Sequence, residues 1–300
     1  MEKIFEVKLE SGEVLKGLEF STDKAVANLT IITGMDEYAR RYKKFAEILN
    51  KNNINVFVLD AFGQGLNVSK VEELEIWPKD AFRKNVDAIA LMIKKAKANG
   101  LKTVHFGHSM GSFMTQSLIE RYPNIADKVI LCGSNGGQLT LMKFGYLVAK
   151  TVRTKSNNDK PNKFLTNLSL GPYSKAIKNR ETDLDWLSFN KENVKTYIAD
   201  PYCGHPNTTG FWVEFLKGMK EIWQTKNLRK IPTNLPILIV SGKEDPVGRN
   251  GKGPLWLEKK YKSLGVEKVD LHLYEKMRHE ILNEENNEEV INNLLEFILN

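Results

Sequence analysis

One serine in this chain stands in a setting that would make its hydroxyl reactive. The sequence GHSMG at residues 107–111 places Ser109 two positions from a glycine on each side. Residues 103–106 predict a short buried strand before it, and residues 112–119 predict a helix after it. A turn this tight strains the serine backbone, and side chains at the two glycine positions would collide with the neighbouring strand and helix. The pattern predicts a nucleophile at the positive end of a helix; the alternative is a turn whose serine only caps that helix.

A serine hydroxyl needs a base that removes its proton and an acid that orients the base. Two later apolar strands, at 236–240 and 269–274, each run into a loop that carries one of these residue types. The first loop offers Glu244 and Asp245, and we favour Asp245 because a short carboxylate followed by proline suits a fixed loop. The second loop offers His279 as the base. The order serine, acid, histidine is the one expected of this strand–turn–helix motif.

The other four histidines receive different interpretations. His105 and His272 fall within predicted strands, so we expect them to be packed there. His108 belongs to the turn and should support it. His205 lies in the middle of the chain, where it is a candidate for lining a substrate pocket.

Acyl transfer also needs backbone donors for a developing oxyanion. One should be the N–H of Met110, directly after the nucleophile, and the other should come from the loop after an early strand, at Gly34 and Met35. We therefore expect Met35 and Met110 to form the oxyanion hole, with Gly34 next to the substrate. The alternative for this early loop is an ordinary strand-to-helix turn.

Short apolar strands alternate with helices along most of the chain, which predicts an α/β fold with a mostly parallel sheet covered on both faces. We expect a hairpin near the N-terminus and helices over about 37–51 and 79–99. Residues 136–232 contain helical pieces and no clear strand. We expect them to form a cap inserted between two parts of a core, residues 1–135 and 233–300, above the carboxyl ends of the strands.

The composition is that of a globular protein and limits the classes of partner. Hydrophobic residues are 41% of the 300 residues and charged residues 27%, which is ordinary for such a chain. The net charge of +7 comes from dispersed lysines, without the basic stripe and interleaved aromatics of a nucleic-acid binder. Two cysteines, no apolar leader and no apolar run of about 18 residues predict a cytoplasmic protein without a disulfide framework or membrane span. We expect no metal and no organic cofactor.

These motifs resemble the monoacylglycerol lipase and lysophospholipase family of α/β-hydrolases, including its bacterial members. The resemblance covers nearly the whole chain and rests on residues 33–42, 60–65, 107–111, 185–188, 200–204, 245–248 and 278–284. It implies the α/β-hydrolase fold, with an eight-stranded sheet and a helical cap. It also implies a serine esterase that acts on a small-molecule ester or lysolipid, with Ser109, Asp245 and His279 as its triad. Met35 and Met110 would be its oxyanion donors.

Several alternatives remain open at this point. A peptidase or thioesterase is the nearest rival within the fold, and Glu214 or Asp200 could form the acidic pocket that an aminopeptidase needs. A ligand-binding module or an interaction protein on the same scaffold would need no triad. Residues 139–152 are apolar and punctuated by basic residues, so the cap could make a transient contact with a membrane surface or simply pack onto the core.

Overall fold

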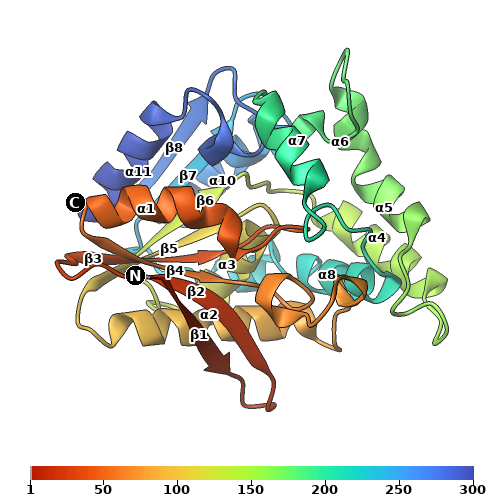
Figure 1. Cartoon of the computed structure of the whole chain (residues 1–300), viewed down its shortest axis with the longest axis horizontal. Helices are drawn as coiled ribbons and strands as arrows, with labels where there is room; N and C mark the ends of the chain where they lie inside the picture. The colour runs from red at the N-terminus through yellow and green to blue at the C-terminus, as the bar shows by residue number, and fades with distance from the viewer. Residues whose placement is uncertain (1) are drawn as a thin grey trace.

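Eight strands form a single sheet in a computed structural model that describes residues 2–300. The order across the sheet is β1-β2-β4-β3-β5-β6-β7-β8 (Figure 1). The β1–β2 and β2–β4 pairs are antiparallel and the other five pairs are parallel, so the prediction of a mostly parallel sheet is confirmed. The strands are β1 (Glu2–Lys8), β2 (Val14–Phe20), β3 (Ala27–Ile32), β4 (Ile54–Leu59), β5 (Lys102–His108), β6 (Lys128–Cys132), β7 (Ile237–Gly242) and β8 (Val269–Tyr274).

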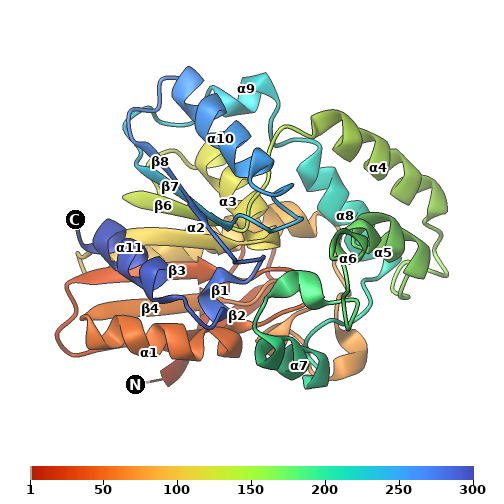
Figure 2. The same cartoon turned by 90° about the horizontal axis from the view of Figure 1, so that it is seen from above.

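Helices cover both faces of the sheet because its central strands are apolar on both sides. All residues of β3, β4 and β7 are buried. Helices α1 (Lys43–Lys51) and α11 (Glu288–Leu299) pack on one face. Helices α2 (Ala81–Lys97), α3 (Met110–Arg121) and α10 (Lys252–Ser263) pack on the other (Figure 2).

The helices between β6 and β7 make up the segment that we call the cap, and most of them lie together at one end of the sheet in both cartoon views (Figures 1 and 2). The last of them, α9 (Thr225–Leu228), lies instead beside α10 in Figure 2. Within residues 136–232 the structure has no strand, only an isolated bridge between Pro161 and Thr208. The cap helices are α4 (Leu139–Val152), α5 (Lys163–Ser169), α6 (Gly171–Ala176), α7 (Lys191–Ala199), α8 (Thr209–Met219) and α9 (Thr225–Leu228). Short 3-10 helices are η1 (Ala39–Tyr42), η2 (Gly65–Asn67), η3 (Val71–Glu73), η4 (Asp185–Leu187) and η5 (Ile281–Asn283).

The helix predicted over 37–51 begins later than expected. Tyr38 is extended, residues 39–42 form η1, and the α-helix starts only at Lys43. The cause is a buried carboxylate: Asp60 at the end of β4 accepts a hydrogen bond from the Ala39 N–H at 2.6 Å. The chain before α1 is therefore held as a loop, which leaves its side chains free to face the carboxyl ends of the strands.

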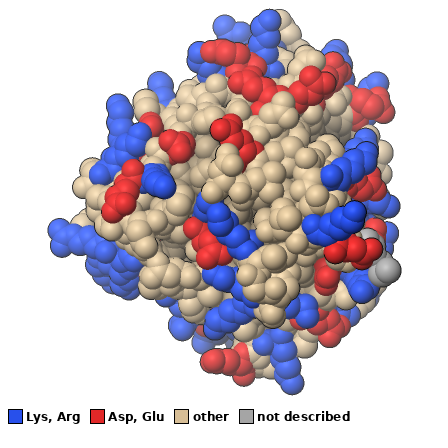
Figure 3. Space-filling view, turned by 90° about the vertical axis from the view of Figure 1, so that its left-hand side faces the viewer, with Lys and Arg blue, Asp and Glu red and all other residues tan. Residues whose placement is uncertain are grey.

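The surface and the cysteines agree with the composition. Basic and acidic side chains are interspersed on the face seen in Figure 3. Cys132 in β6 and Cys203 in the cap are both buried free thiols. Within residues 2–300, none of the helices combines the length and apolar character needed to cross a bilayer.

Candidate active site

Ser109 occupies a strained turn between β5 and α3. Its backbone has φ 51° and ψ −120°, outside the regions that side chains usually allow. A Cβ on Gly111 would lie 2.5 Å from the Ile32 carbonyl oxygen, and one on Gly107 would overlap the Thr115 hydroxyl. Both glycines are therefore required by close packing, and the turn leaves Ser109 partly exposed between buried neighbours.

His279 and Asp245 meet at the carboxyl ends of β8 and β7. The His279 Nδ1 lies 2.9 Å from Asp245 Oδ2, and both side chains are almost completely buried. The Val247 N–H donates to the other carboxylate oxygen at 2.8 Å, which fixes the orientation of Asp245. Glu244, the alternative acid, is exposed to solvent. Because Nδ1 faces the carboxylate, Nε2 is the nitrogen left to act on a hydroxyl.

The His279 ring is held from two further sides. The Trp186 ring of η4 packs against it with centroids 5.2 Å apart, so the cap contributes directly to the position of the imidazole. A Cβ on Gly133, after β6, would lie 3.0 Å from His279 Cε1. No hydrogen bond joins Ser109 to His279 among the residues described, and such contacts commonly tighten only when substrate binds.

The loop after β3 lies against the serine. A Cβ on Gly34 would be 3.1 Å from Ser109 Cβ, so this position must stay without a side chain. Met110 is the first residue of α3, and its N–H is one of the donors that a helix leaves unpaired. Neither the Met35 nor the Met110 N–H donates to another group within the described part of the chain. Two backbone donors are thus free beside the serine.

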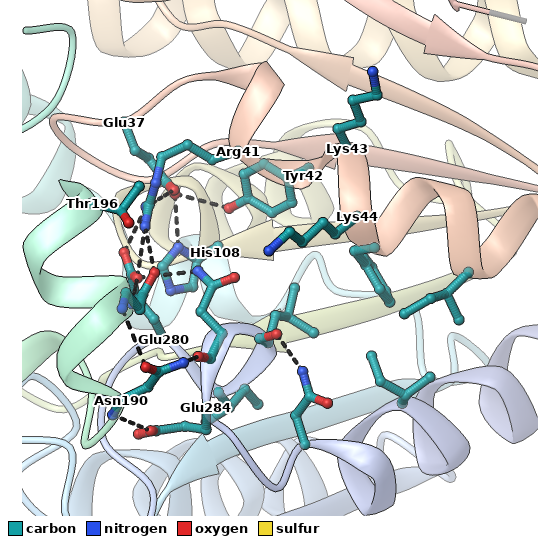
Figure 4. A pocket seen from close by; sticks show the side chains of 18 of the residues that line it. Glu37, Arg41, Tyr42, Lys43, Lys44, His108, Asn190, Thr196, Glu280 and Glu284 are labelled. Carbon is teal, nitrogen blue, oxygen red and sulfur yellow. Dashed lines mark hydrogen bonds and ion pairs between the residues drawn. The ribbon is translucent and has the colours of Figure 1, made fainter. Parts of the chain in front are cut away.

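Glu37 is a buried carboxylate that bonds to residues of the loop after β3, of η1 and of the serine turn. Its Oε1 accepts hydrogen bonds from the Gly34 N–H at 2.5 Å and from the Tyr42 hydroxyl at 2.8 Å, and lies 2.8 Å from His108 Nδ1. Its other oxygen pairs with Arg41 at 2.9 Å. Figure 4 shows these side chains pointing toward one another. One side chain therefore ties the loop after β3 to the serine turn.

Arg41 extends the same network to the histidine loop. It pairs with Glu280, the residue after His279, through contacts of 2.6 and 2.8 Å. The Glu280 side chain is buried and also accepts a hydrogen bond from Asn193 of the cap at 2.6 Å. His108 completes the ring with a 3.4 Å contact from Nε2 to the His279 carbonyl oxygen.

The charges of this network set one another's protonation. Burial alone would raise the pKa of Glu37, but His108 and Arg41 bring it below its ordinary value. Burial lowers the pKa of His108, and the Glu37 charge outweighs this effect and raises it. Although burial opposes ionisation, Arg41 lowers the pKa of Glu280 to about 2. These buried side chains are therefore ionised, and their ion pairs and hydrogen bonds offset the cost of burying the charges.

A second buried group of polar side chains joins the loop after β3 to the cap. Asp36 has a left-handed backbone at φ 57°, and its Oδ1 accepts a hydrogen bond from Asn207 at 2.6 Å. Its carbonyl oxygen accepts from the Tyr197 hydroxyl at 2.8 Å and the Gly204 N–H at 3.1 Å. Three cap residues thus hold the residue next to Met35.

Burial also alters the ionisation of Asp36 and of its acidic neighbour Glu75. It raises the pKa of Asp36 to about 7, although hydrogen bonds from Asn207 and Glu75 favour the ionised form. Burial and the negative charge of Asp36 raise the pKa of Glu75 well above its ordinary value. At least one proton is therefore retained on this pair at neutral pH.

The remaining candidates from the sequence lie apart from this cluster. His105 is buried between the hydroxyls of Thr30 and Thr115, each 3.0 Å away, and burial lowers its pKa to about 3. His272 contacts Asn293 on α11. His205 lies half-buried in the cap, with its Nδ1 shielded from solvent and without a partner among the described residues.

A cavity of about 810 Å³ opens behind the network, between α1, α7 and η5. Glu37, Arg41, His108 and Glu280 form part of its wall (Figure 4), and Ser109 is not among the residues that line it. Sequence reasoning missed this network. The spacing of Glu37 and Arg41, four residues apart and ahead of a helix, was the signal that could have indicated an ion pair.

Solved structures with the same architecture define the fold class. The chain superposes on a thermostable carboxyl esterase from Bacillus coagulans with a TM-score of 0.84, 21% identity and coverage of 99% of this chain and 97% of that one. It superposes on the monoglyceride lipase of Saccharomyces cerevisiae with a TM-score of 0.74 and 16% identity, covering 98% and 94%. The protein therefore has the α/β-hydrolase fold.

A family model then gives the particular group. The chain belongs to the hydrolase family described as serine aminopeptidase, S33 (Hydrolase_4), whose model matches residues 23–286. A curated relative, Phospholipase YtpA of Bacillus subtilis (strain 168), is 27% identical over 133 residues, which are 44% of this chain. The match spans about half of that relative, 49% of its length.

Proposed function

We propose that this protein is a carboxylic ester hydrolase that uses Ser109, His279 and Asp245 as a catalytic triad. The observation that carries the proposal is the strained serine turn beside a buried His279–Asp245 pair. A buried base oriented by a carboxylate beside a partly exposed hydroxyl is the arrangement that nucleophilic acyl transfer requires. The family membership supports a hydrolase.

The reaction follows from the positions of these groups. His279 Nε2 takes the proton of Ser109 as its Oγ attacks the ester carbonyl carbon, and the resulting oxyanion accepts hydrogen bonds from the Met35 and Met110 N–H groups. The imidazolium then gives its proton to the alcohol oxygen of the substrate as the carbon–oxygen bond breaks. The alcohol leaves, and the acyl group stays on Ser109. Water attacks the acyl group with the same base, and Ser109 recovers its proton. Asp245 keeps Nδ1 protonated throughout.

We infer that the substrates are monoacyl lipids, such as a monoacylglycerol or a lysophospholipid. Support comes from the cap, whose helix α4 exposes Leu141, Phe144 and Leu147 to between 54% and 62%. Such residues could contact an acyl chain or a membrane surface transiently. Names of relatives point the same way, since they include a phospholipase and a monoglyceride lipase. Gly34 and His205 would contact the substrate in this proposal.

The name of the family model supports the peptidase alternative, but the acidic side chains that it would need do not. An aminopeptidase needs a free carboxylate for the substrate amine. Glu214 accepts a hydrogen bond from the Asp80 N–H and pairs with Arg153 at 3.7 Å. Asp200 accepts hydrogen bonds from the Tyr38 hydroxyl at 2.8 Å and from the Tyr202 N–H. Both candidates are already engaged within the protein, so we favour ester hydrolysis.

A substrate panel tests the proposal. Purified protein and its Ser109→Ala variant would be assayed with p-nitrophenyl esters, monoacylglycerols, lysophosphatidylcholine and aminoacyl-anilides. We expect Ser109-dependent release of fatty acid from the monoacyl lipids at higher kcat/KM than anilide cleavage. Preferred cleavage of the anilides would instead establish the peptidase. The two free buried cysteines fit a reducing compartment, so a cytoplasmic location stays part of the proposal. The proposed acyl transfer needs no cofactor.

A further inference from the structure

A second cavity, of about 550 Å³, lies on the side of the cap away from the Glu37 network. We call it the α3–α4 pocket. It lies between the end of α3, the outer face of α4 and residues 220–230, and its lining contains no residue of the proposed triad. Whatever this pocket does is therefore separate from the acyl transfer step.

Five cations line the α3–α4 pocket: Arg121, Lys143, Lys220, Lys226 and Lys230. Among the residues that the structure describes, none of the five forms an ion pair with a carboxylate. Like charges gathered around one cavity repel each other unless an anion is bound there. By contrast, Lys217 of α8 pairs with both Asp80 and Glu214.

The acids of the pocket do not neutralise this charge. Glu120 is buried, and burial raises its pKa to about 8, so it is protonated at neutral pH. Glu221 is the other carboxylate among the residues that line the pocket. The Arg121 Nε is shielded from solvent and has no hydrogen-bond partner within residues 2–300. The half-buried Arg121 side chain therefore has donor capacity left for an anionic oxygen.

The rim of the pocket is apolar and points outward. Leu147 lines the pocket and is 59% exposed, and Phe144 on the same helix is 62% exposed. Tyr146 lies between them, with its ring 3.9 Å below the Lys220 ammonium. Exposed apolar side chains beside unpaired cations match a lipid surface, where an anionic headgroup and acyl chains occur together. A soluble anion would use the cations and leave Phe144 and Leu147 in water.

We propose that the α3–α4 pocket binds the phosphate of an anionic phospholipid headgroup while Phe144 and Leu147 enter the apolar layer beside it. Arg121 and the four lysines supply the hydrogen bonds and charge. The pocket would anchor the cap to an anionic membrane surface. This inference specifies the membrane contact of the proposed function, but it depends on binding alone and not on hydrolysis.

Vesicle co-sedimentation tests the proposal. The protein carrying Ser109→Ala, which prevents turnover of lipid, would be mixed with phosphatidylcholine vesicles with or without phosphatidylglycerol. The test variant adds Lys220→Gln, Lys226→Gln and Lys230→Gln. The matched control instead adds Lys3→Gln, Lys24→Gln and Lys51→Gln, which remove equal charge from three exposed lysines at the opposite end of the molecule. Circular dichroism melting checks that both variants fold.

We expect binding to the anionic vesicles only, with about a 5-fold loss of affinity per pocket lysine and about 100-fold for all three. The control should stay close to the parent, and Leu147→Ser should weaken vesicle binding without changing the charge. Equal losses in test and control variants would show diffuse attraction and overturn the proposal. Displacement from vesicles by millimolar inorganic phosphate at constant ionic strength would overturn it as well, because the pocket would then be a site for free phosphate. Hydrolysis of a soluble ester is measured separately and bears only on the proposed function.

Discussion

Replacing Asp36 by asparagine should make the folded protein more stable at alkaline pH than the wild type. Asp36 is buried beside Glu75, and its pKa is raised from 3.8 to about 7. An acid with a raised pKa in the folded state binds its proton more tightly there than in the unfolded chain. The contribution of protonated Asp36 to the free energy of unfolding is therefore greatest below the unfolded pKa of 3.8 and falls as the pH rises toward the folded pKa of about 7.

The size of the effect follows from this shift. Each pKa unit corresponds to about 1.4 kcal/mol, so the rise from 3.8 to about 7 gives an upper value of about 4 kcal/mol. Asparagine has nearly the same shape, and its carbonyl oxygen can still accept the 2.6 Å hydrogen bond from Asn207. Its amide can donate to Glu75 without any charge. The Asp36→Asn variant should avoid the ionisation penalty and keep the link to the cap.

Urea denaturation at pH 4 and pH 8 measures this difference. We expect the free energy of unfolding of Asp36→Asn, relative to the wild type, to improve by about 2–4 kcal/mol between the two pH values. Asp23→Asn serves as the control, since Asp23 is exposed on a loop. A relative stability that does not change with pH, or that changes equally for both variants, would refute the account of the buried acid pair.

Three further predictions concern the site itself. Asp245→Asn should lower kcat for ester hydrolysis about 10⁴-fold with little change in KM, because the imidazole tautomer is lost; a loss below tenfold in steady-state assays would contradict that role. Gly34→Ala places a Cβ 2.6 Å from Glu37 Oε1 and should reduce kcat about 100-fold by moving the oxyanion loop, whereas unchanged kinetics would exclude it from the site. Glu37→Gln should lower the free energy of unfolding by about 3 kcal/mol near pH 5.5. Folding lowers the pKa of Glu37 from 4.5 and raises the pKa of His108 from 6.5. The attraction between the two charges therefore stabilises the folded protein fully between pH 4.5 and pH 6.5, and this stabilisation declines at higher pH as His108 loses its proton. A deficit in urea denaturation that grows between pH 6 and pH 9 would argue against this pair.

Local patterns in the sequence were enough to predict the elements that carry the site. Residues 103–106 lie within β5, and the helix predicted over 79–99 is α2, Ala81–Lys97. These predictions worked because strand and helix periodicity, and the glycines around Ser109, reflect contacts within a few residues. The loops after β7 and β8 followed because parallel strands end at the same edge of a sheet.

Contacts between distant parts of the chain could not be predicted in this way. Arg41 and Glu280 are 239 residues apart, and Asp36 and Asn207 are 171 apart. The sequence around each of these four residues does not show that their side chains will share a buried space. The helix predicted from residue 37 also placed Glu37 on an ordinary helix, whereas the Asp60 carboxylate holds this stretch as a loop. Charged residues next to a proposed catalytic residue are therefore ambiguous until the fold brings their partners together.

The nucleophilic role of Ser109 can be measured directly by active-site labelling. The protein would be treated with a fluorophosphonate, digested, and analysed by peptide mass spectrometry, alongside hydrolysis of a p-nitrophenyl ester. The account predicts a single adduct on the peptide that contains Ser109, and loss of both the adduct and the hydrolysis in Ser109→Ala. An adduct on another residue, or a Ser109→Ala variant that hydrolyses the ester at the wild-type rate, would contradict it.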